Sequence, residues 1–82
     1  MNETINRAGF LHLLNQWLTD DVASDAEREQ YARRLEQDHI SSLGLLLELS
    51  QDDFRTMGFA AGHRVRIVEN ARRLLKQGKR KI

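Results

Sequence analysis

The apolar residues of this chain recur with helical spacing, and no stretch alternates in the way a strand does. In the N-terminal part, apolar side chains lie three or four positions apart, at Phe10, Leu11, Leu14, Trp17 and Leu18. This spacing predicts a helix over about residues 8–18. A second helix is predicted over about 25–37, with Tyr31 and Leu35 facing inward, and a third of only a turn or two around 43–47.

Polar caps and glycines mark where helices begin and end. Ser24 is followed three residues later by Glu27, and Ser50 by Asp53. This is the spacing of a capping box, in which side chains and backbone amides satisfy one another at a helix start. Gly58 can take the left-handed conformation that closes a helix, because it has no Cβ. We therefore expect a short fourth helix that begins at Ser50 and is ended by Gly58.

The last predicted helix starts at Gly62 and is amphipathic. Its apolar residues fall at i, i+1, i+4, i+7 and i+8, which is one helix face: Ile67, Val68, Ala71, Leu74 and Leu75. Steps of about 100° per residue place Val65 outside this sector, so we expect Val65 to be exposed. The side chains expected to be mostly buried are Trp17, Leu35, Ile40, Leu46, Leu49, Phe54, Met57, Ile67, Ala71 and Leu74.

These signals together resemble the sterile alpha motif (SAM) family over about residues 10–76. The most specific part lies within residues 49–76, which read LSQDDFRTMGFAAGHRVRIVENARRLLK. The motifs that carry the resemblance are Asp53-Phe54, Met57-Gly58-Phe59, Gly62-His63-Arg64 and Ile67, supported by Trp17-Leu18, Tyr31-Ala32 and the run 40–49. The resemblance implies an all-α, five-helix orthogonal bundle that acts as a non-catalytic protein-interaction module.

Length and composition favour one small domain. The chain has 82 residues and no cysteine, so it has neither a disulfide framework nor a thiolate metal site. Residues 1–7 lack the pattern of a signal peptide, and we expect them to form a flexible lead-in. Residues 8–77 are expected to form the domain, and 78–82 a basic tail or linker. A cytoplasmic or nuclear location is the expectation.

Charge is unevenly distributed along the chain. Residues 19–61 contain ten acids and four bases, a net charge of −6, whereas residues 62–82 contain eight bases and one acid, a net charge of +7. Segments of opposite sign on one molecule can attract further copies of it in a directed way.

The SAM resemblance also implies two binding surfaces that suit these charges. The mid-loop surface would comprise Asp38, Leu45, Glu48, Asp52 and Asp53. The end-helix surface would comprise Phe59, Ala60, Gly62, His63, Arg64, Val65 and Arg66. The implied function is head-to-tail self-association into oligomers or polymers, or pairing with another SAM domain, with Val65 as an apolar anchor inside a charged rim.

Catalysis finds no support in the residue pattern. His12, His39 and His63 are far apart and have no cysteine partner, so we expect no metal and no cofactor. Asp52 and Asp53 begin a short surface helix, where interaction with the helix dipole explains them better than acid–base chemistry. We expect a protein that is not an enzyme, and for His63 a local hydrogen bond that fixes the loop after Phe59.

RNA binding is the alternative function. Basic residues lie along the last helix at Arg64, Arg66, Arg72, Arg73 and Lys76, and such a stripe suits phosphate contacts. However, Gly62-His63-Arg64-Val65-Arg66 departs from the Gly-Ala-Arg-Arg-Lys type of pattern in the RNA-binding branch of the family. A basic amphipathic helix could also touch anionic membranes, but we expect no membrane contact, because the last helix must give its apolar face to the core.

Overall fold

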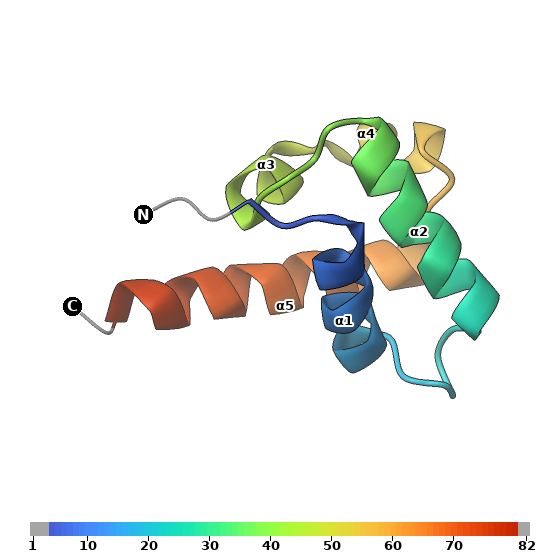
Figure 1. Ribbon diagram of the computed structural model, residues 1–82, viewed down its shortest axis with the longest axis horizontal. Coiled ribbons are helices and arrows are strands. Elements are labelled where there is room, and N and C mark those ends of the chain that lie inside the picture. The colour runs from blue at the N-terminus through green and yellow to red at the C-terminus, as the bar shows by residue number, and fades with distance from the viewer. Residues whose placement is uncertain (1–3, 81–82) are drawn as a thin grey trace.

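The computed structural model describes residues 4–80 and contains five helices in that range (Figure 1). They are α1 (Arg7–Trp17), α2 (Asp25–Gln37), α3 (Leu43–Glu48), α4 (Gln51–Thr56) and α5 (Ala61–Arg80). Helix α1 packs against α2, and both α1 and α3 pack against the long α5. The predicted all-α, five-helix bundle is confirmed. None of the helices within residues 4–80 is both long and apolar enough to cross a membrane.

The start of α1 is held by contacts within the region expected to be a lead-in. The Asn6 side chain caps the helix by accepting a hydrogen bond from the Gly9 amide (2.8 Å). The Ile5 amide donates to the Ser41 carbonyl oxygen (2.7 Å), which ties this segment to the connection between α2 and α3. Residues 1–3 of the expected lead-in lie outside the described range.

Both predicted capping boxes are confirmed. At α2 the Ser24 amide donates to the Glu27 carboxylate (2.9 Å), and the Glu27 amide donates to the Ser24 hydroxyl (3.1 Å). The first of these hydrogen bonds lowers the pKa of Glu27. At α4 the matching distances between Ser50 and Asp53 are 2.9 and 3.0 Å.

Helix α4 ends as predicted, at a glycine with positive φ. Gly58 has φ 91°, and its amide donates to the Arg55 carbonyl oxygen, while the Phe59 amide donates to the Phe54 carbonyl oxygen (both 3.0 Å). These two hydrogen bonds form a Schellman motif. The apolar clasp that accompanies it is the edge-to-face pair of Phe54 and Phe59, whose ring centroids are 5.3 Å apart.

Helix α2 ends in the same motif without a glycine. His39 has φ 59°, and its amide donates to the Glu36 carbonyl oxygen (3.1 Å), while the Ile40 amide donates to that of Leu35 (2.9 Å). The predicted end of this helix, at about residue 37, is correct, but the left-handed conformation at His39 was not predicted because no glycine marks the position.

Most of the predicted core is confirmed. Leu35, Leu46, Phe54, Met57, Ile67 and Ala71 are buried, together with Phe10, Leu14 and Leu18 from the N-terminal part. Trp17, Ile40 and Leu49 are only partly buried and pack against this cluster. The prediction that Leu74 is buried is wrong, because its side chain is 37% exposed.

Leu74 is exposed because α5 is longer than the body against which it packs. Its 20 residues give a helix about 30 Å long. The last buried residue is Ala71, and every side chain from Arg72 to Gly78 is exposed. Figure 1 shows the final turns of α5 extending past α1 and α3. The helix continues through Arg80, so most of the expected basic tail is helical; residues 81 and 82 lie outside the described range.

A buried arginine closes the connection between α1 and α2. Arg28 is 3% exposed, and its guanidinium donates to the carbonyl oxygens of Leu18 (2.6 Å) and Ala23 (3.1 Å). It also forms ion pairs with Asp20 (2.7 Å) and Asp25. The hydrogen bond with Asp20 raises the pKa of Arg28, so the side chain stays charged. Sequence reasoning missed this role.

Candidate protein-interaction surfaces

Two of the predicted mid-loop acids border one open groove between α2 and α4. Asp38 follows the last turn of α2, and Asp53 lies in the first turn of α4. The groove has a volume of about 310 Å³ and is lined also by the apolar side chains of Ile40, Leu49 and Met57, by Thr56, and by Arg34, which pairs with Asp38. This combination of an apolar lining with acidic edges suits a small apolar side chain flanked by bases.

The other predicted mid-loop residues are exposed but do not line this groove. Leu45, on α3, is 44% exposed, and Glu48 is exposed at the end of the same helix. Asp52 is exposed in the first turn of α4. The structure therefore brings Asp38 and Asp53 together at the groove, whereas Leu45, Glu48 and Asp52 are exposed outside it.

Several of these acids already have partners within the chain. Asp38 pairs with Arg34 (3.0 Å), and Asp52 lies 3.8 Å from Arg55. Asp53 accepts the capping hydrogen bond from Ser50. Exposed pairs of this kind contribute little to stability, so the carboxylates of Asp38 and Asp52 can exchange partners, whereas Asp53 also serves the fold.

The end-helix surface is formed by the α4–α5 loop and the first turns of α5. Val65 is 43% exposed, as its helical phase predicts, and the adjacent Arg66 is exposed too. Arg64 is half-buried and lines a hollow of about 180 Å³ together with Arg55 and Phe59. The exposed valine thus lies between two arginines along the helix, one of which borders a hollow large enough for a carboxylate group.

Phe59 and the small residues beside it differ in exposure. Phe59 is 6% exposed and stacks on the Tyr31 ring, with centroids 4.2 Å apart and planes 15° from parallel. Its side chain therefore belongs to the core and anchors the α4–α5 loop to it. Ala60 and Gly62 are exposed at the loop surface.

His63 is half-buried and connects three parts of the chain. Its Nε2 lies 2.9 Å from the Val22 carbonyl oxygen and its Nδ1 lies 2.7 Å from the Tyr31 hydroxyl. A carbonyl oxygen only accepts, so Nε2 carries a proton; in the neutral ring Nδ1 then accepts from Tyr31. The Tyr31 oxygen in turn accepts from the Ala60 amide (3.3 Å). Burial raises the pKa of Tyr31, which keeps its hydroxyl protonated as a donor.

The expectation of a local hydrogen bond for His63 is wrong. Its partners lie 32 and 41 positions away in the sequence, on α2 and on the connection between α1 and α2. Because Ala60 precedes α5 and His63 lies in its first turn, this network fixes the end-helix surface against the rest of the bundle.

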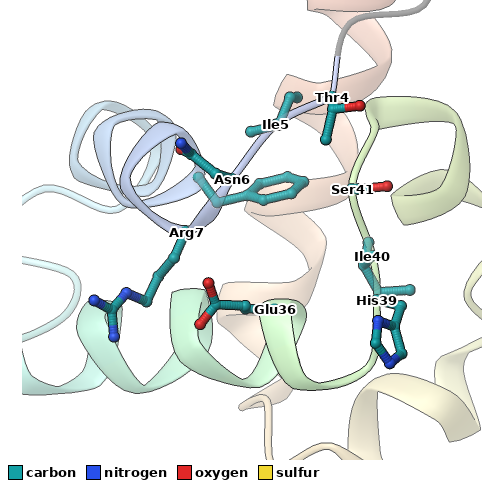
Figure 2. A pocket seen from close by; sticks show the side chains of 9 residues that line it. Thr4, Ile5, Asn6, Arg7, Glu36, His39, Ile40 and Ser41 are labelled. Carbon is teal, nitrogen blue, oxygen red and sulfur yellow. The ribbon is translucent and has the colours of Figure 1, made fainter.

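A further hollow, of about 200 Å³, lies where the N-terminal segment meets the end of α2 (Figure 2). Ile5 and Arg7 line it from one side, and Glu36, His39 and Ile40 from the other. Ile40 also lines the mid-loop groove, so the two hollows share a wall. Within the described part of the chain, no group of three or more histidine, cysteine or acidic side chains is arranged to hold a metal ion.

Comparison with known proteins gives one result. The family model of the SAM domain (sterile alpha motif) matches residues 14–75, which is most of the chain. No curated protein and no solved structure gives a match. SAM domains are in general non-catalytic modules that mediate interactions with other SAM domains or with other proteins. The match and the five-helix bundle agree, and the chain belongs to the sterile alpha motif family.

Proposed function

We propose that this SAM domain self-associates head to tail, with the mid-loop surface of one copy receiving the end-helix surface of the next. The observation that supports this most is Val65, an apolar side chain that is 43% exposed between two arginines. A single exposed valine is ordinary. Placed inside a basic rim at the start of α5, it has the form of an interface anchor.

The groove between α2 and α4 offers a complementary binding site for Val65 of the next copy. Its lining by Ile40, Leu49 and Met57 would bury Val65 of the next copy, and Asp38 at its edge would face the arginines of that copy. Apolar burial would supply most of the affinity, while the charges would set orientation and association rate. The same two surfaces would serve pairing with a different SAM domain.

Such an interface is heterologous, because it joins two different surfaces. Each added copy therefore leaves one free mid-loop surface and one free end-helix surface, and growth need not close. The supporting charge pattern is the net −6 of residues 19–61 against the net +7 of residues 62–82.

The proposal is tested with one variant for each surface. Val65→Glu places a charge where the anchor should be buried. Asp38→Lys with Asp52→Lys reverses the mid-loop surface and spares Asp53, whose carboxylate caps α4. Sedimentation over a concentration series should show that the parent chain assembles. The affinity of self-association should be lower by at least about tenfold in each variant.

Ala26→Glu is the matched control for Val65→Glu. Ala26 is exposed in the first turn of α2, outside both surfaces, and receives the same new charge. This control should assemble as the parent does. The proposal is wrong if the parent stays monomeric at high concentration and low salt, or if both surface variants assemble normally.

A further inference from the structure

The end of α5 differs from the rest of the molecule in charge. Residues 72–82 contain six bases and no acid: Arg72, Arg73, Lys76, Lys79, Arg80 and Lys81. The side chains of the first three are exposed. Among the described residues, the ion pairs of the structure involve none of these three. Among the described side chains, this end of the helix is therefore a positive surface that has no ion-pair partner.

The same segment also exposes apolar side chains. Leu74 and Leu75 are 37% and 36% exposed, and with Leu45 and Val65 they make up the exposed large hydrophobic residues of the described chain. Both continue the stripe that buries Ile67 and Ala71 earlier in the helix. The stripe thus runs on past Ala71, the last buried residue of α5, into the part of the helix that extends beyond α1 and α3 (Figure 1).

Helical phase separates these apolar and basic side chains. Steps of about 100° per residue place Leu74, Gly78 and Leu75 within one sector of about 100°. Arg72, Lys76 and Arg73 fall outside it, at least about 100° from Leu74. The end of α5 is therefore a short amphipathic helix with a leucine side and a basic side.

We propose that the end of α5 docks on a membrane surface rich in anionic phospholipid. Clusters of four to eight bases on an amphipathic helix are typical of segments that bind anionic headgroups. The leucine side would enter the boundary between headgroups and acyl chains, while the basic side chains reach the phosphates along their flexible stems. The expectation of no membrane contact assumed that the core covers the whole apolar face of the last helix, and the exposure of Leu74 and Leu75 removes that ground. The proposed mode of binding lays the helix end on the bilayer and requires no membrane-spanning segment.

Two other anionic or apolar partners fit the segment less well. RNA would use the bases but leave Leu74 and Leu75 in water, and residues 72–80 contain no aromatic side chain for stacking on nucleotides. A second copy packed leucine to leucine along this segment would bring two strongly positive helices together, which like-charge repulsion opposes. An anionic bilayer satisfies both the charge and the apolar side.

The test measures cosedimentation of the full 82-residue chain with vesicles. Vesicles of phosphatidylcholine mixed with phosphatidylserine should bind the chain, and vesicles of phosphatidylcholine alone should not. Binding should weaken as salt is added. Arg72→Glu with Arg73→Glu should weaken binding by more than about tenfold, because two attractive charges become repulsive. Leu74→Ser with Leu75→Ser should also weaken it, by about tenfold.

Arg7→Glu with Arg33→Glu is the matched control. Both arginines are exposed and lie on α1 and α2, so the control changes the net charge equally but away from the end of α5. It should bind vesicles nearly as the parent does. Thermal melts by circular dichroism establish that each variant is folded. The variant Arg72→Glu with Arg73→Glu tests the proposal even if the serine variant unfolds at a low temperature.

Four outcomes would overturn the proposal. They are no binding to phosphatidylserine vesicles at low salt, equal loss in the control, no effect of the serine pair in a folded variant, or tighter binding to a hairpin RNA than to the vesicles. Since the vesicle assay uses α5 residues outside the end-helix surface, Val65→Glu should bind vesicles normally. The result is thereby independent of self-association.

Discussion

His39 and Gly58 occupy the same position in two helix-ending motifs, and only one of them is a glycine. Both have positive φ, at 59° and 91°. A residue with a Cβ is strained in this conformation by roughly 1–2 kcal/mol. A Cβ built on Gly58 would meet no atom within 4 Å, so the conformation alone, and no steric clash, favours glycine there.

This comparison predicts opposite effects for two substitutions. His39→Gly should stabilise the domain by about 0.5–1 kcal/mol, since relief of strain exceeds the extra entropy that glycine gives the unfolded chain. Gly58→Ala should destabilise it by about 1 kcal/mol. Urea denaturation at low protein concentration, where self-association does not contribute, measures both. A destabilised His39→Gly variant would contradict the account of this helix end.

Individual side chains were predictable from the sequence when their partners are close in the chain. The capping boxes at Ser24 and Ser50 involve residues three positions apart, and Gly58 closes a helix that immediately precedes it. By contrast, Arg28 finds its partners up to 10 positions away, and His63 up to 41. Such long-range hydrogen bonds depend on how the helices pack, which no local spacing reveals.

At the scale of the element, α5 shows what periodicity can and cannot establish. Its apolar stripe fixes the face that turns to the core, and both the burial of Ile67 and the exposure of Val65 follow from it. Periodicity does not state where the neighbouring helices stop. Leu74 continues the stripe but lies past the last buried residue, Ala71, so the sequence placed it wrongly in the core.

Two alanine substitutions on the same face of α5 should therefore have unequal effects. Ile67 is 0% exposed, so Ile67→Ala should cost roughly 2–5 kcal/mol through lost burial and the cavity left behind. Leu74→Ala should cost less than about 1 kcal/mol, because much of that side chain already meets water. Thermal melts of the two variants beside the parent check this. Equal losses would mean that the end of α5 packs more tightly than its exposure indicates.

The candidate surfaces were predictable to different degrees for a similar reason. The exposure of Val65 follows from helical phase within one element. The groove that joins Asp38 to Asp53 requires the relative placement of α2 and α4, which the sequence pattern alone did not provide. Leu45 and Glu48, assigned to the same surface by family resemblance, lie on α3 outside that groove.

At the scale of the whole molecule, the two proposed surfaces lie on different elements and carry opposite charge. The mid-loop groove is formed by α2 and α4, and the end-helix surface by the start of α5. Val65 and Asp38 can therefore be changed independently, each leaving the other surface intact. Under the proposed head-to-tail assembly, a chain with one altered surface would still bind once but could not be extended at both ends.

This independence leads to a prediction for mixtures. Val65→Glu keeps a working mid-loop surface, and Asp38→Lys with Asp52→Lys keeps a working end-helix surface. Each variant alone should sediment as a monomer, whereas an equimolar mixture should form a dimer and nothing larger, because the one intact contact leaves no complementary pair of free surfaces. Added salt should shift the mixture back toward monomer, since screening weakens the charged rim. A mixture that stays monomeric while the parent assembles would show that the assembling parent uses other surfaces, and a mixture that grows beyond the dimer would show that a third contact exists.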